Sequence, residues 1–307
     1  MAPVLQRGIA RRWKAILAGI VVLALLAAAA WQYREQPVTA RPALWRLSLG
    51  DRHAWLFGTI HAVPTGARWL SPAIASAAQE SDGLVLEAAG LEAERRDARV
   101  FETLGRSAGL PPVASRLNPA DRPRLAALVK ASPTVLRDLD GYESWAAALL
   151  IGAAANGQGG ASSEDAPEAR LEKLFRANGH STTGLETISE QLGLFDALPQ
   201  GDQDALLAQA VTEAADAPRQ FGQLYARWAA GDLGAIEAQF LRPLDQSPRL
   251  RNALVDQRNA LWARRIDKLL RENGRTYFIA VGTGHLIGPK NVISSLTQRG
   301  WKVERVQ

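Results

Sequence analysis

Two short segments with the pattern Gly-Thr-x-His contain the side chains best suited to chemistry in this chain. They are Gly58 to His61, which reads GTIH, and Gly282 to His285, which reads GTGH, in a sequence that has only four histidines. Each segment follows an apolar run typical of a buried β-strand, WLF in the first case and YFIAV in the second. A glycine there lets the backbone turn sharply or approach a ligand closely. His61 and His285 are therefore our first candidates for a metal-binding or catalytic site.

Two glutamates follow other predicted strands in the same way. Glu87 comes directly after LVL, and Glu186 comes after residues 181–185, which we predict to be a strand. If the four runs are parallel strands of one sheet, the groups at their ends meet at one edge, where open α/β sheets bind ligands. The simpler alternative is that each histidine bonds loop backbone and each glutamate pairs with an arginine.

Two imidazoles with one or two carboxylates can hold a divalent metal ion and leave a position for water. A metal ion lowers the pKa of its water toward about 7, so that hydroxide can attack an amide carbonyl. The second carboxylate would then act as the general base. We exclude His53, which also follows the pattern Gly-x-x-His, because it lies beside a predicted hairpin turn.

Arg258 lies on the apolar face of a predicted helix, four residues after one leucine and three before another. A buried arginine needs a carboxylate partner because an unpaired buried charge is very costly. Glu87 and Glu186 are the candidate partners. Asn259, the next residue, can hold a carboxylate or a substrate carbonyl. The alternative is that Arg258 extends to the surface along its stem.

The elements that must position these residues alternate between strand and helix at both ends of the chain. We predict a hairpin at 44–57 with its turn at 50–51, a helix at 72–81 and a strand at 84–86, and then a strand, a helix and a strand at 276–281, 291–298 and 302–306. Helices dominate between about 92 and 275, with a Gly/Ser-rich stretch at 156–163 that we expect to be a flexible loop. The expected fold is α/β (α+β), with a split βαβ core sheet and a large helical insertion.

The first 35 residues predict export. Residues 1–14 contain four basic and no acidic residues, which supply +4 of the formal net charge of +5, and 15–31 contain no charged or polar side chain. This is typical of a signal peptide or an uncleaved signal anchor in the inner membrane. We therefore expect two parts, 1–35 and an exported domain at 36–307, located in the periplasm or cell envelope. The domain's remaining net charge of +1 argues against a nucleic-acid partner.

Five segments together resemble the TraB/GumN family, which is related to the Tiki-type membrane proteases. They are LFGTIHAVP, LVLEA, GLETISEQLGLFDALP, DQRNALWARRI and VGTGHLIGPKNVISSLTQRGWKVERV, and the resemblance covers about residues 43–307. It implies a fold of the erythromycin-esterase-like and ChaN-like kind. It also implies that His61, Glu87 and His285 are metal-site positions, for manganese or cobalt, with zinc as a further candidate.

The resemblance makes Glu186, Arg258 and Asn259 the remaining family-characteristic polar residues. It also implies an acid before the helix that precedes the Leu-Glu-Thr motif, which Glu164 or Asp165 fits only loosely. The predicted function is an exported, metal-dependent, peptidase-like hydrolase that acts on a peptide or protein substrate. The alternatives are a haem- or metal-binding module and a non-catalytic envelope protein linked to surface polysaccharide production.

Overall fold

The computed structural model of this chain describes residues 40–307, except 89–93, 159, 246 and 273. The predicted signal or anchor segment at 1–35 lies outside the described residues. Residues Ala40–Gln307 belong to one compact unit. Within the part of the chain that the structure describes, no helix is both long and apolar enough to cross a membrane.

The core is a six-stranded mixed sheet with the strand order β6-β4-β7-β2-β1-β8. The strands are β1 (Leu44–Leu49), β2 (Arg52–Thr59), β4 (Gly83–Ala88), β6 (Ser181–Glu186), β7 (Tyr277–Gly282) and β8 (Lys302–Arg305). Strands β6, β4, β7 and β2 are parallel, whereas β1 runs antiparallel to both β2 and β8. The predictions of an α/β fold and of an amino-terminal hairpin are confirmed. Because β7 lies between β4 and β2, strands from opposite ends of the chain are neighbours.

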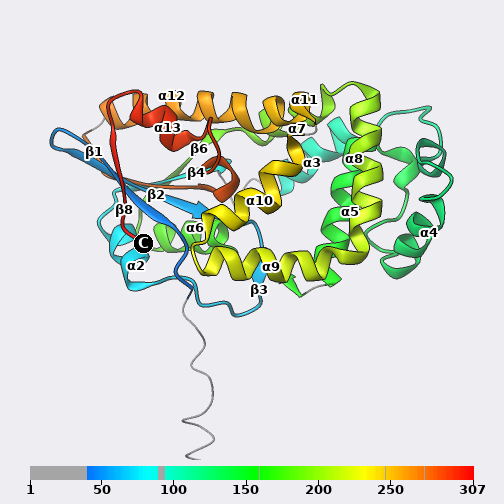
Figure 1. The fold of residues 1–307 in the computed structure, drawn as a ribbon, viewed down its shortest axis with the longest axis horizontal. Coiled ribbons are helices and arrows are strands. Elements are labelled where there is room, and N and C mark those ends of the chain that lie inside the picture. The colour runs from blue at the N-terminus through cyan, green and yellow to red at the C-terminus, as the bar shows by residue number, and fades with distance from the viewer. Residues whose placement is uncertain (1–39, 89–93, 159, 246, 273) are drawn as a thin grey trace, which may run out of the picture. The chain divides into compact units, whose positions relative to one another are not determined.

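Helices cover both faces of this sheet (Figure 1). They are α2 (Pro72–Gln79), α6 (Pro167–Ala177), α9 (Ala217–Ala229) and α10 (Leu233–Leu244) on one face, and α12 (Gln257–Glu272) and α13 (Val292–Thr297) on the other. Alternate residues of a strand point to opposite faces, so in β4 Leu84 and Leu86 pack in the first layer and Val85 in the second. Burial on both faces explains why the central strands read as unbroken apolar runs.

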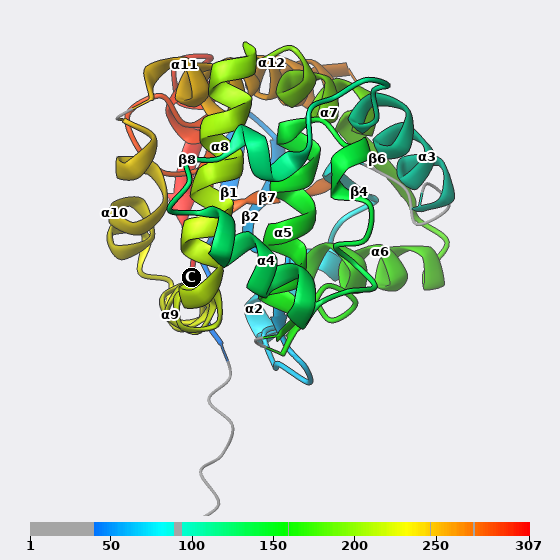
Figure 2. The same ribbon diagram turned by 90° about the vertical axis from the view of Figure 1, so that its right-hand side faces the viewer.

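A separate group of helices has its own core beyond the carboxyl end of β2 (Figures 1 and 2). It comprises α3 (Glu94–Gly105), α4 (Arg122–Ala131), α5 (Ser144–Gln158), α7 (Ile188–Asp196) and α8 (Gln200–Glu213). Trp145 is fully buried there between Phe101 and Phe195, with ring centroids 5.7 and 6.1 Å away. These helices therefore lie on the side of the sheet where the candidate residues were predicted to meet.

One predicted loop is in part a strand. Within the Gly/Ser-rich stretch at 156–163, β5 (Ala161–Ser162) pairs antiparallel with β3 (Val63–Pro64). The reason is tertiary, because the partner strand comes from about a hundred residues earlier in the chain and directly follows His61. The pairing holds the start of α6 beside the first Gly-Thr-x-His segment.

Candidate metal and catalytic site

The two Gly-Thr-x-His segments end adjacent parallel strands, with Thr59 beside Gly282 in the register of β2 and β7. A Cβ atom on Gly58 would lie 2.8 Å from Oγ1 of Thr283, so only glycine fits this contact. Thr283 Oγ1 donates a hydrogen bond to the Thr59 carbonyl at 3.0 Å, and Trp228 Nε1 donates to the Gly58 carbonyl at 2.8 Å. The motif glycine at position 58 thus provides room for the neighbouring strand.

Gly282 marks the point where three predicted metal ligands approach one another. Its backbone N–H donates to Glu87 Oε1 at 2.6 Å. A Cβ atom on this glycine would lie 3.0 Å from Glu87 Oε1, 3.8 Å from His285 Cδ2 and 3.9 Å from His61 Nε2. Burial of the Glu87 carboxyl raises its pKa, but His285, His61 and Arg258 bring the net pKa below its ordinary value. Side chains at the carboxyl ends of β2, β4 and β7 therefore lie around one backbone position.

The tautomer of His285 follows from its partners. Asn259 Nδ2 donates to the Lys290 carbonyl at 2.8 Å, so its Oδ1, 2.7 Å from His285 Nδ1, accepts a hydrogen bond from the ring N–H. His285 Nε2 then carries the lone pair, and Arg258 Nη1 donates to it at 3.2 Å. Burial lowers the pKa of His285 to about 4, which keeps the ring neutral near pH 7. Metal-binding histidines are commonly oriented in this way, by an acceptor bonded to the ring nitrogen that does not bind the metal.

Arg258 joins the buried groups of the site. Its guanidinium donates to both oxygens of Glu186, at 2.7 and 3.2 Å, and to Glu87 Oε2 at 3.3 Å. It lies over the ring of Trp262, 4.5 Å from the ring centroid, and Trp262 Nε1 donates to Glu186 at 3.0 Å. Arg258 therefore has the carboxylate partner that its burial predicted, and it pairs with both candidates. Glu186, whose side chain is only 3% exposed, is bonded by Arg258 and Trp262 and positions that arginine.

The carboxylate beside His61 comes from Glu168, a residue that sequence reasoning missed. His61 Nδ1 lies 3.0 Å from Glu168 Oε1, and Thr59 Oγ1 donates to the same oxygen at 2.6 Å. The hydrogen bond and the charge of Glu168 raise the pKa of His61 to about 9. The His61 side chain is 72% exposed, so solvent weakens this pairing and a ligand can reach the ring.

The signal for Glu168 was weak because an acid after a proline in the first turn of a helix usually serves the helix dipole. The weaker family-based candidates lie elsewhere: Glu164 is exposed, and Asp165 Oδ2 accepts from the Gly66 N–H at 3.2 Å. Glu168 Oε2 is buried and has no hydrogen-bond partner among the described residues. A buried carboxylate oxygen without a donor is suited to accept a proton or bind a cation.

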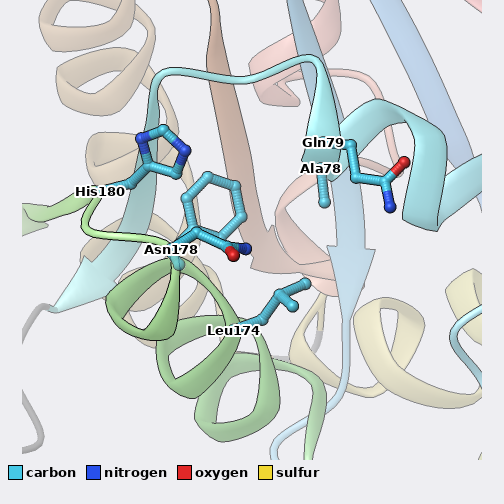
Figure 3. Close-up of a pocket in the computed structure, with 6 residues that line it drawn as sticks. Ala78, Gln79, Leu174, Asn178 and His180 are labelled. Atoms are coloured by element: carbon cyan, nitrogen blue, oxygen red, sulfur yellow. The ribbon is translucent and has the colours of Figure 1, made fainter.

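A cavity of about 240 Å³ opens at this edge of the sheet. It is lined by His61, Leu86, Glu87, Ala88, Ser163, Ala166, Glu168, Ala169 and Gln191. A second cavity of about 400 Å³ lies at the opposite edge, before the amino ends of β4 and β6 (Figure 3). Its described lining includes Gln79, Asn178 and His180 but no acidic side chain.

The imidazole nitrogens and carboxylate oxygens of this site are chemically suited to a divalent cation, although they are not arranged around an ion. In the described residues, no group of three or more histidine, aspartate or glutamate side chains is placed to hold a metal as it stands. Glu87 and Glu186 nevertheless bond the Arg258 guanidinium, and Glu168 lies beside His61, so the three carboxylates outnumber the two positive groups next to them. His285 Nε2 and the free oxygen of Glu168 supply nitrogen and oxygen donors of the kind that bind zinc, manganese or cobalt.

The fold and the site define an α/β protein with a histidine and carboxylate cluster at the carboxyl edge of its sheet. The model of the TraB/PrgY/gumN family matches residues 43–305, and the chain belongs to this family. This confirms the family resemblance seen in the sequence, including the distant relationship to the Tiki metalloproteases.

Three curated relatives each match about a fifth of the chain. Metalloprotease TIKI2 of Xenopus tropicalis is 44% identical over 55 residues, 18% of this chain and 10% of that protein. Metalloprotease TIKI2 of Danio rerio is 41% identical over 56 residues (18% and 11%), and metalloprotease TIKI1 of Danio rerio is 38% identical over 71 residues (21% and 14%). The matches thus span about a tenth of the length of these relatives. No solved structure gave a significant match.

Proposed function

We propose that this chain is a metal-dependent hydrolase of peptide bonds, with His61, Glu87 and His285 as the metal-binding residues. The observation that carries the proposal is the approach of these three side chains to one backbone position, Gly282, from the carboxyl ends of three parallel strands. The distant metalloprotease relatives support peptides as the substrate class. A divalent ion bound there would lower the pKa of water and polarise the substrate carbonyl.

The protein's own residues would carry the proton transfers. Glu168 has one oxygen without a partner in the cavity, so it can take a proton from the attacking water and pass it to the leaving nitrogen. Thr59 and His61 hold its other oxygen and set its orientation. Asn259 keeps His285 in the tautomer whose Nε2 can bind a cation.

Metal binding also requires Arg258 to move. In this structure the guanidinium donates to His285 Nε2 and to Glu87 Oε2, which are two of the atoms that would hold the ion. Both oxygens of Glu186 remain available to it after such a movement. Arg258 would then be a second positive group beside the reacting carbonyl, where it can stabilise an oxyanion.

Metal analysis of histidine variants tests this function. We expect the full-length chain, purified in mild detergent and supplied with Mn²⁺, Co²⁺ and Zn²⁺ in turn, to retain about one ion per chain. His61→Ala and His285→Ala should lose it. His53→Ala and His180→Ala are matched controls, because His53 lies at the other end of β2 and His180 lines the cavity at the opposite edge. Equal metal content in His61→Ala and His53→Ala would refute the site.

Turnover on a library of fluorescence-quenched peptides distinguishes a hydrolase from the alternatives. Cleavage that depends on both His61 and Glu168 supports the proposal. Metal uptake without cleavage favours a metal-binding module or a non-catalytic envelope protein, and a Soret shift on mixing with haem favours a haem carrier.

We further propose that the domain acts in the periplasm or cell envelope, held at the inner membrane by residues 15–31. The support is the basic and then uncharged sequence of the first 31 residues. Protease treatment of spheroplasts should digest the domain, whereas protection of the domain until lysis would contradict this location.

A further inference from the structure

Gln191 is held in position by interactions that do not involve its own side chain. It lies in the first turns of α7, whose N-cap Thr187 forms a reciprocal capping box with Glu190. Glu190 N donates to Thr187 Oγ1 at 3.1 Å, and Thr187 N donates to Glu190 Oε2 at 2.7 Å. Arg265 of α12 also donates to Glu190, at 3.0 Å. The backbone of α7 is therefore fixed next to the end of β6.

Gln191 lines the 240 Å³ cavity together with His61, Glu87 and Glu168. The residue is half-buried, and no described residue forms a hydrogen bond with its side-chain carboxamide. The side chain of Gln203 in α8, by contrast, does have a hydrogen-bond partner, because it donates to the Leu198 carbonyl at 3.1 Å.

A carboxamide has one acceptor oxygen and two donor hydrogens in a plane, which match the C=O and N–H of a peptide group. The alanines at 88, 166 and 169 leave room beside it for an extended backbone. Such a cavity is smaller than most drug-sized pockets, so it would hold a short piece of a longer substrate.

We propose that Gln191 is a specificity-determining residue that binds the backbone peptide group next to the scissile bond. This inference rests on the proposed function, since it assigns the substrate of the same cavity. If Gln191 binds a neighbouring peptide group, the preferred substrates are secondary amides that have a further peptide group beside the scissile bond. Isolated amides and esters should be poor ones.

The kinetic test uses Gln191→Met, which keeps the length of the side chain and removes its hydrogen-bonding groups. We expect KM for the best peptide of the quenched library to rise about 5-fold, with kcat and metal content nearly unchanged. Gln79→Met is the matched control, because Gln79 lines the cavity at the opposite edge of the sheet. An unchanged KM in Gln191→Met would overturn the inference.

A second measurement separates recognition from a structural effect. Replacing the neighbouring amide of that peptide with an ester should raise KM for the wild-type chain, but should have no further effect on Gln191→Met. Equal sensitivity of both proteins to the ester would overturn the inference.

Binding without turnover keeps this inference distinct from the proposed function. If the wild-type chain cleaves no peptide, hydrolysis is refuted. The inference is then judged by calorimetry with acetylated, amidated peptides from the same library. Weaker binding to Gln191→Met than to wild type and Gln79→Met supports it, and equal binding, or no binding to any of them, overturns it.

Discussion

Replacing Glu186 with glutamine should destabilise the folded chain much more than breaking an exposed ion pair. The Glu186 carboxylate is 3% exposed and accepts hydrogen bonds from Arg258 at 2.7 and 3.2 Å and from Trp262 at 3.0 Å. The side chain of Arg258 is itself 11% exposed, so the substitution leaves a buried guanidinium with Glu87, 3.3 Å away, as its remaining carboxylate. Removing one partner of a buried pair costs 3–5 kcal/mol, and we expect about 3 kcal/mol because Glu87 still neutralises part of the charge.

Thermal unfolding followed by circular dichroism measures this cost. A loss of about 3 kcal/mol lowers Tm by about 6–12 °C in a domain of this size. Asp216→Asn is the control, because it breaks the exposed pair of Asp216 with Arg219, which contributes little.

The double variant Glu186→Gln/Arg258→Met should recover part of the loss, since no buried guanidinium remains without its partner. The reasoning is refuted if Glu186→Gln unfolds at the same temperature as Asp216→Asn. It is also refuted if the double variant is less stable by the full sum of the two single changes.

Three further predictions concern the groups around the cavity. Gly282→Ala places a methyl carbon 3.0 Å from Glu87 Oε1, so we expect the carboxylate to be displaced and metal uptake to be lost, as measured by elemental analysis. Asn259→Leu removes the acceptor that orients the buried imidazole, and the metal Kd from calorimetry should rise about 10- to 100-fold. In the metal-free chain, NMR should show His61 titrating at about 9, and Glu168→Gln should lower this pKa toward its ordinary value of about 6.5. Because the pKa of His61 is raised in the folded chain, its pairing with Glu168 contributes its full stabilisation below about pH 6.5. This contribution is lost as the pH rises through about 9.

Each of these changes has a control elsewhere in the domain. Gly152→Ala adds a methyl group where nothing lies within 4 Å, so normal metal uptake by that variant shows that the effect is local. Asn178→Leu and Glu164→Gln change exposed residues and should leave the metal Kd and the His61 titration as in the wild type. Metal uptake by Gly282→Ala, an unchanged Kd in Asn259→Leu, or an unchanged His61 pKa in Glu168→Gln would each contradict its prediction.

Local patterns in the sequence predicted the strands and much of the site. The apolar runs before His61, Glu87 and His285 are interior strands, because residues buried on both faces of a sheet must be apolar, whereas the more polar stretch before Glu186 is the edge strand β6. Arg258 was expected to need a carboxylate partner because a buried guanidinium is costly without one, and it pairs with both candidates, Glu87 and Glu186.

Other features depended on which elements meet at the carboxyl edge of the sheet. Glu168 lies 107 positions from His61, and it is brought there by the pairing of β3 with β5 and the packing of α6. Asn259, expected to hold a carboxylate or a substrate carbonyl, instead holds His285. Local patterns were enough to predict the six strands of the main sheet and the need of Arg258 for a carboxylate partner. Which carboxylate faces which imidazole could not be predicted, because hydrogen-bond partners depend on distances between helices and strands that lie far apart along the chain.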